Sequence, residues 1–173
     1  MIKKLPAIAF LLLSGCAATA PQDEAVSRVS VTFVEPEKFT DARRAELAPT
    51  SVGVLRELEK FLIETGGRYL SATTKLSIRV TDIDLAGDFE LFRGPQADHV
   101  RITKGLYPPR IVLEFRVTGS DDQTIKAGAR TLTDLDYQLR VVYLREDYLR
   151  HEKELLRDWL RGEFAALKSA RAN

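Results

Sequence analysis

The first regular pattern in the chain is an alternation of apolar and polar residues. Val29, Val31 and Phe33 are separated by polar residues until Pro36 interrupts the run. A period of two predicts a half-buried strand, which the proline ends.

The same alternation returns twice. Ile111, Leu113, Phe115 and Val117 give the cleanest strand pattern in the sequence. Residues 119–122 are typical of a turn, and the apolar positions that follow them are Ile125, Ala127 and Ala129. We therefore expect two strands joined as a β-hairpin.

An irregular strand precedes this hairpin. Its apolar positions are Leu76, Ile78, Val80, Ile83 and Leu85. The last two stand out of phase with the first three, and the slip falls near residues 81–82. A β-bulge restores an inward face after such a slip, so we expect a bulge or a strand break there.

Helical spacing appears in two places. In the first, Leu55, Leu58 and Leu62, with Phe61 beside them, fall on one face. Thr50 or Ser51 is expected to cap this helix. Gly66 and Gly67 are expected to end it, because glycine adopts the left-handed conformation without a Cβ penalty. Residues 41–47 are expected to form a short helical turn before it.

The second helical pattern runs from Glu146 or Asp147 to about Lys168. Its apolar positions are Leu149, Leu155, Leu156, Trp159, Leu160, Phe164 and Leu167. This spacing predicts a long C-terminal helix whose Leu156, Trp159 and Leu160 face the sheet.

The order of these elements predicts an α+β fold. We expect a single antiparallel or mixed sheet of four to five strands, one helix after the first strand, and the long C-terminal helix packed on one face. Tyr137, Leu139, Val141 and Tyr143 also alternate. This segment could form a further strand, or it could connect directly to the C-terminal helix.

The N-terminus has the features of an export signal. Lys3 and Lys4 precede an apolar run that is far shorter than the roughly 20 residues of a membrane-spanning helix. Residues 13–16, Leu-Ser-Gly-Cys, resemble the bacterial lipobox, which implies that the thiol of Cys16 is lipidated and that the signal peptide is then cleaved before this cysteine. We expect a signal peptide over residues 1–15, a lipidated flexible tether over 16–25 and a single domain over 26–173.

The resemblance to a lipobox also implies a location. The residue after the cysteine is Ala17 and not the aspartate that retains many lipoproteins at the inner membrane. We therefore expect the chain at the outer membrane, facing the periplasm. Cys16 is the chain's one cysteine, so no internal disulfide can form.

Charge restricts the class of partner. The chain has 26 basic and 25 acidic residues, and removal of residues 1–15 takes away only two lysines. A nearly neutral domain argues against a nucleic-acid partner, which would require a basic face. The expected partners are the membrane, through the lipid, and another envelope protein or cell-wall material.

Several segments together resemble a known family. They are Val31–Asp41, Val80–Glu90, Tyr107–Arg110, Glu152–Leu156 and Asp158–Arg161. They resemble the DUF3016 family, an exported bacterial family of unknown function. The resemblance implies a single periplasmic domain and supplies no activity, cofactor or catalytic residue.

The densest acidic cluster consists of Asp82, Asp84, Asp88 and Glu90. Carboxylates this close together could bind a hard cation. A calcium loop that began at the first of them would place Gly87 correctly, but Ala86 and Arg93 would replace two oxygen ligands. The sequence therefore favours solvated acids, with the cluster as a weak metal candidate.

Catalytic sets are incomplete in this sequence. A zinc helix starting at His151 would need a second histidine where Leu155 stands, and His99 is the one other histidine. We therefore expect His151 to be a solvated helix residue, and no serine lies in a Gly-x-Ser-x-Gly elbow. A carboxylate pair for hydrolysis could be drawn from Asp82, Asp84, Asp134 and Asp136, but the sequence does not show two of them facing each other.

The segment from Gln96 to Gly105 has little apolar periodicity. It could be a partner-binding loop, or it could form a short strand over residues 100–103. The candidate contact residues are His99, Arg101, Lys104 and Tyr107.

The sequence thus favours a lipid-anchored periplasmic accessory or binding domain without a catalytic site or cofactor. Two alternatives stay open. One is a carboxylate-based hydrolase acting on envelope polymers, and the other is a lipoprotein that binds a small ligand or a cation.

Overall fold

A computed structural model describes residues 28–41, 52–89, 101–140 and 146–169. The elements, in chain order, are β1 (Val29–Phe33), the 3-10 turn η1 (Pro36–Lys38), α1 (Val52–Gly66), β2 (Lys75–Asp84), β3 (Asp88–Phe89), β4 (Arg101–Ile102), β5 (Arg110–Thr118), β6 (Thr124–Thr133), the 3-10 turn η3 (Tyr137–Leu139) and α2 (Arg150–Ser169).

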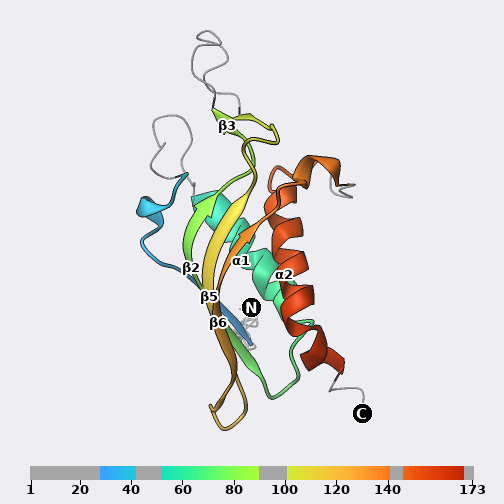
Figure 1. Cartoon of the computed structure of the whole chain (residues 1–173). Coiled ribbons are helices and arrows are strands. Elements are labelled where there is room, and N and C mark those ends of the chain that lie inside the picture. The colour runs from blue at the N-terminus through green and yellow to red at the C-terminus, as the bar shows by residue number, and fades with distance from the viewer. Residues whose placement is uncertain (1–27, 42–51, 90–100, 141–145, 170–173) are drawn as a thin grey trace, which may run out of the picture.

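The α+β fold is confirmed, and its main sheet is mixed. The strand order is β1-β2-β5-β6, in which β1 runs parallel to β2 and the remaining pairs are antiparallel. A parallel pair requires a long crossover, which the segment containing α1 supplies. The short strands β3 and β4 form a separate two-stranded sheet above the main one (Figure 1).

The bulge predicted in the second strand is present. Val80 pairs with Leu113, whereas the next pair joins Asp82 to Val112, so the register shifts at Thr81. Because of this shift, Ile83 points into the core and is 1% exposed. The phase slip in the sequence therefore has the expected physical cause.

The predicted hairpin is β5–β6. Its turn is closed by a bond from the Gly119 amide to the Gln123 carbonyl (3.0 Å), and Asp122 has a positive φ of 57°. The apolar positions predicted for β6 face outward, since Ile125 is 51% exposed and Ala127 and Ala129 are exposed, whereas Leu132 packs against the core. Lys126 and Arg130 instead face α2, where both pair with Glu163.

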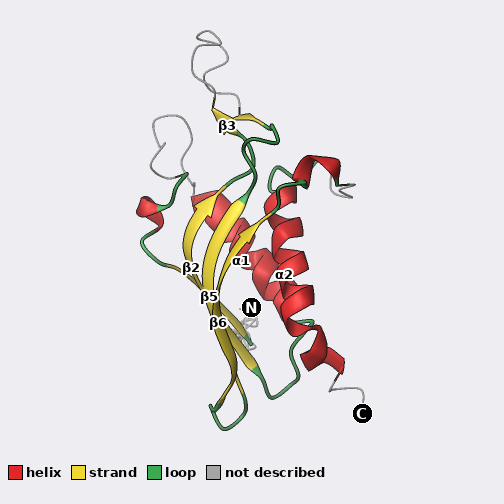
Figure 2. Ribbon diagram, viewed as in Figure 1, coloured by secondary structure: helices red, strands yellow, loops and turns green. Residues whose placement is uncertain are grey.

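Both helices cover the same face of the sheet, and the opposite face is open to solvent (Figure 2). α1 buries Val54, Leu58 and Leu62, while Leu55 and Phe61 are partly buried against the same core. It ends at Gly66 as predicted, but not through a left-handed glycine, because among the described glycines the positive φ belongs to Gly87.

Gly66 lies close to β1. A Cβ atom there would lie 3.4 Å from Cγ2 of Val29, which is ordinary van der Waals contact, so the packing alone does not require glycine. The proposed cap residues Thr50 and Ser51, and most of the predicted helical turn at 41–47, lie outside the described residues.

α2 carries the largest part of the aromatic core. Leu156, Trp159 and Leu160 are buried as predicted. The Trp159 ring meets Phe115 and Phe164 edge to face, at centroid distances of 5.7 Å and 5.5 Å. Among the described helices, none combines the length and the apolar composition that a membrane span requires.

One predicted boundary was wrong. α2 begins at Arg150 and not at Glu146 or Asp147, since the Asp147 carboxylate accepts a bond from the Leu149 amide (2.9 Å) ahead of the helix. Of the two alternatives left open at Tyr137 and Leu139, the strand is not observed: these residues form η3, in which Tyr137 is buried. Val141 and Tyr143 lie outside the described residues.

Candidate functional site

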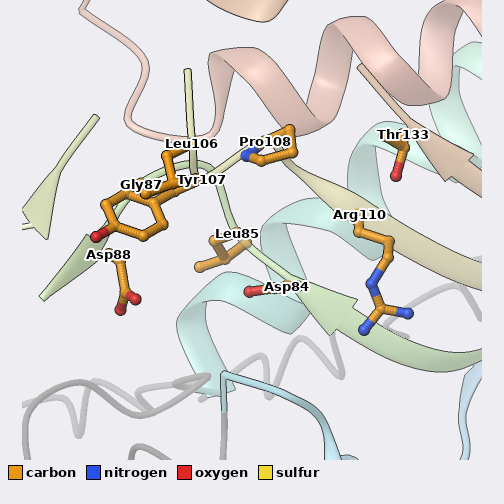
Figure 3. Close-up of a pocket in the computed structure, with 9 residues that line it drawn as sticks. All are labelled: Asp84, Leu85, Gly87, Asp88, Leu106, Tyr107, Pro108, Arg110 and Thr133. Atoms are coloured by element: carbon orange, nitrogen blue, oxygen red, sulfur yellow. The ribbon is translucent and has the colours of Figure 1, made fainter. Parts of the chain in front are cut away.

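One end of the main sheet carries a cavity. Asp84, Arg110 and Thr133 are paired neighbours there, at the ends of β2, β5 and β6, and we call this the pocket end. The cavity beside it has a volume of about 320 Å³. It is lined by Asp84, Leu85, Gly87, Asp88, Leu106, Tyr107, Pro108, Arg110 and Thr133 (Figure 3).

The lining combines charged and apolar groups. In Figure 3, Tyr107 and Asp88 lie at one side of the cavity, Arg110 and Thr133 lie at the other, and Leu85 is between them. Leu106 is 76% exposed at the rim. A concave surface with apolar walls and a few polar groups is the usual form of a binding site.

A second hollow, of about 480 Å³, lies on the solvent-facing side of the sheet. Its polar residues are exposed, and two of them, Arg79 and Glu114, pair at 3.1 Å. Exposed pairs across strands are ordinary for a solvated sheet face. We therefore place the candidate site at the pocket end.

Asp82 is bound behind the cavity. Its carboxylate accepts bonds from the amide (2.7 Å) and hydroxyl (2.9 Å) of Thr40 and from Arg110 (2.6 Å). Burial alone would raise the pKa of Asp82, but these hydrogen bonds and the guanidinium charge outweigh it and lower that pKa. Asp82 therefore joins the segment after β1 to the sheet and is unsuited to act as a general acid.

The cavity wall between β2 and β3 is the segment Leu85–Gly87, which we call the pocket turn. All three of its amides donate to other parts of the chain. The acceptors are the carboxylate of Asp41 (2.5 Å), the carboxylate of Glu152 (2.6 Å) and the carbonyl of Tyr107 (3.0 Å), in that order.

Gly87 is required by the backbone at this turn. Its φ is +84°, and a Cβ atom would lie 2.8 Å from the carbonyl oxygen of Ile102. Glycine avoids both the strain of that conformation and the collision.

Arg101 holds the same turn from the other side. Its guanidinium donates to the carbonyls of Leu85 (2.8 Å) and Ala86 (2.9 Å) and to both carboxylate oxygens of Asp41 (3.0 Å each). It also lies over the Phe89 ring, 5.3 Å from the centroid. The side chain is 21% exposed, and its hydrogen bonds are to residues of the same chain, while its role as a partner contact stays a prediction.

Glu152 is the most deeply buried acid at this end, with 1% of the residue exposed. Burial raises its pKa, and Asp41 adds to that effect, while the Ala86 amide and Arg101 oppose it. Its Oε2 atom is buried without a hydrogen-bond partner among the described residues.

His151 is also placed differently from the sequence prediction. It is partly buried, and its ring meets Tyr137 edge to face at 4.8 Å. Burial and the neighbouring Arg150 lower the pKa of His151. The prediction of a solvated histidine was therefore wrong.

The acidic cluster of the sequence is divided. Asp84 and Asp88 line the cavity, Asp82 lies behind it, and Glu90 is outside the described residues. Within the described ranges, no three histidine, cysteine or acidic residues are placed to hold a metal ion. Asp134, considered for hydrolysis, is buried and pairs with Arg140 (2.6 Å).

The predicted partner loop is only partly described. Tyr107 lines the cavity, and the carbonyl of Lys104 accepts a bond from the Tyr137 hydroxyl (2.7 Å). The alternative of a short strand is confirmed over Arg101–Ile102, which pairs with β3. His99 and Cys16 lie outside the described residues.

Sequence reasoning missed Asp41 and Glu152. Glu152 had a detectable signal, because it lies three residues after Leu149 and four before Leu156 and so falls on the apolar face of α2. Asp41 had none, since its partners at Leu85 and Arg101 are distant in the sequence.

Comparison with known proteins gives one result. No curated protein matches the chain, and no solved structure does. A family model described as a protein of unknown function, DUF3016, matches residues 27–162, which is most of the sequence. The chain therefore belongs to the DUF3016 family.

Proposed function

We propose that the chain is a lipid-anchored periplasmic binding domain that acts as an accessory factor in the cell envelope. In this proposal Cys16 carries the lipid and the protein faces the periplasm from the outer membrane. The cavity at the pocket end receives another envelope protein or cell-wall material.

The observation that supports binding over catalysis is the role of the acids next to the cavity. Asp41, Asp82 and Glu152 each accept hydrogen bonds that hold backbone segments in place. A carboxylate-based hydrolase needs one acid that donates a proton to substrate, with a raised pKa and access to the cavity. Asp82 has the opposite pKa shift, and Glu152 does not line the cavity.

Anchoring is tested by Cys16→Ser in cells fed labelled palmitate. Only the thiol accepts the lipid, so the label should be lost and the protein should leave the membrane fraction. Label that persists in the variant would contradict the anchor.

Binding at the cavity is tested by a photoreactive residue at Leu106, on the exposed rim, in living cells. Ile125, exposed at the other end of the sheet, is the matched control. We expect adducts from position 106 and none from position 125. Equal adducts from both positions, or none from position 106, would contradict a binding role for the pocket end.

A further inference from the structure

The pocket turn depends on a residue that does not touch the cavity. Leu85 and Gly87 line the cavity, and Ala86 between them donates its amide to Oε1 of Glu152 on α2. Glu152 is 66 residues away in the chain. The shape of the cavity wall is therefore linked to the state of one buried carboxyl group.

The surroundings of Glu152 oppose its ionisation. Asp41, from the segment after η1, adds a negative charge, and burial together with the charge of Glu152 raises the pKa of Tyr137 on η3. Burial and Arg150 lower the pKa of His151, the neighbour of Glu152 on α2, which favours the neutral imidazole. Arg101 of β4 favours the charged form, but its guanidinium is shared among Asp41 and two carbonyls.

One oxygen of Glu152 makes ionisation costly. Oε2 is buried without a partner among the described residues, and a charged oxygen needs donors or water. Ionisation therefore favours conformations in which water reaches the carboxylate. The Ala86 bond and Arg101 favour the charged form, so opening depends on the cost of leaving the ionised Oε2 without a partner. Movement of α2 away from the pocket turn would admit the water that this oxygen needs, at the expense of the Ala86 bond.

We propose that Glu152 is a proton-sensitive latch on the cavity wall: the protonated side chain holds the Ala86 amide, and loss of the proton releases the pocket turn. A group whose folded pKa is raised gives stability that is complete below its unfolded pKa. That stability is lost as the pH rises through the folded pKa. The pocket turn should accordingly stay closed on Glu152 at acid pH and open more often at alkaline pH.

Hydrogen–deuterium exchange of the full chain in detergent tests the latch directly. After correction for intrinsic exchange rates, protection of the Leu85–Gly87 amides should fall as the pH rises from 4 to 9. One proton linked to opening gives about a tenfold loss for each pH unit within the titration. The amides of β5 serve as the reference and should keep their protection, because local opening leaves the core folded.

Glu152→Gln should remove this pH dependence, since its carbonyl oxygen can still accept the Ala86 bond and its side chain cannot ionise. Glu154→Gln is the matched control on the same helix, where the carboxylate pairs with Arg157, and it should behave as the unaltered protein. An unaltered protein with pH-independent protection, or a Glu152→Gln variant with the original pH profile, would overturn the proposal.

A second measurement covers the case in which Glu152→Gln does not fold. Carboxyl-carbon NMR on the unaltered chain should place the Glu152 midpoint above the ordinary value of 4.5. A midpoint at or below that value would overturn the latch. Only the biological use of the latch rests on the proposed function. If the exchange and NMR experiments contradict the latch, the proposals of lipid anchoring and partner binding are unaffected. If the palmitate and crosslinking experiments contradict those proposals, the latch is unaffected.

Discussion

One helix, α2, takes part in two contrasting regions. Towards its C-terminal half, Trp159 and Phe164 pack against Phe115 with edge-to-face rings, and the cations of Lys126 and Arg130 lie over Phe164 and Phe115 at the margin of this cluster. Near its start, Glu152 lies among Asp41 and Arg101 at the pocket end. Apolar packing stabilises the first region at any pH, whereas the second fixes backbone geometry with buried charges whose desolvation is costly.

The difference indicates a division of labour within the fold. The aromatic region attaches the helix to the sheet, and the charged region shapes the cavity. Substitutions in the first should change global stability, and those in the second should change stability in a pH-dependent or local way.

The largest effect is expected from Trp159→Ala. Trp159 is 7% exposed, and its loss leaves a cavity between α2 and the sheet. We expect a loss of about 3 to 5 kcal/mol in the free energy of unfolding, with little dependence on pH. Chemical denaturation measures it. Tyr148→Ala, at a residue 65% exposed, is the control and should change stability by less than about 0.5 kcal/mol. Equal losses in both variants would refute the packing role.

A smaller effect is expected from Asp41→Ala. It removes the acceptor of the Leu85 amide and the main counter-charge of Arg101, which is only partly exposed. We expect a loss of about 3 kcal/mol, because the remaining partners stay buried without compensation. Denaturation of Glu37→Ala, at an exposed acid on η1, provides the baseline. A melting curve unchanged from that baseline would show that the charged region is dispensable.

Gly87→Ala tests the shape of the pocket turn. The left-handed conformation costs a residue with a Cβ roughly 1 to 2 kcal/mol, and the Ile102 carbonyl must also move. Gly162→Ala is the matched control, since nothing lies within 4 Å of its Cβ position on α2. That variant should be neutral or slightly stabilising. Equal melting temperatures for the two variants would show that the pocket turn does not require glycine at position 87.

Asp82→Asn gives the smallest expected effect on stability. The stability that Asp82 contributes falls towards acid pH, whereas the contribution of Glu152 falls towards alkaline pH. The pKa of Asp82 is lowered in the folded protein, so its contribution is present above the unfolded pKa and is lost as the pH falls through the folded one. The variant should lose about 1 kcal/mol at pH 7 and show a shallower decline towards acid. Thermal melts from pH 2 to 7 measure both slopes. Asp122→Asn, at a carboxylate 80% exposed, should keep the original slope.

The sequence was informative wherever a local pattern reflects burial. The phase slip at residues 81–82 predicted the bulge, and the heptad-like apolar spacing predicted the buried face of α2. It did not predict the direction of β1, because strand patterns are identical in parallel and antiparallel pairs. The sequence also did not predict which face of β6 points inward. Its Lys126 and Arg130 face α2 because both bond to Glu163, which is 33 or more residues away in the chain.

The candidate site was predicted only in part for the same reason. Asp84, Asp88 and Tyr107 were identified individually and do line one cavity. Two of the contacts that shape that cavity join segments 60 residues or more apart, namely Asp41 with Arg101 and Ala86 with Glu152. No periodicity records a contact between segments so far apart.

The parallel pairing of β1 with β2 has a consequence for distance from the membrane. Val29 is opposite Leu76, near the start of β2, whereas the cavity lies beyond the other end of that strand. A ten-residue strand is about 33 Å long. The segment from Cys16 to Arg28 can extend at most about 40 Å. On the proposed anchoring, the tether enters the sheet at the end opposite the cavity, so trimming it would hold the hairpin end near the lipid and limit the cavity's distance from the lipid to about the length of the sheet and the remaining tether.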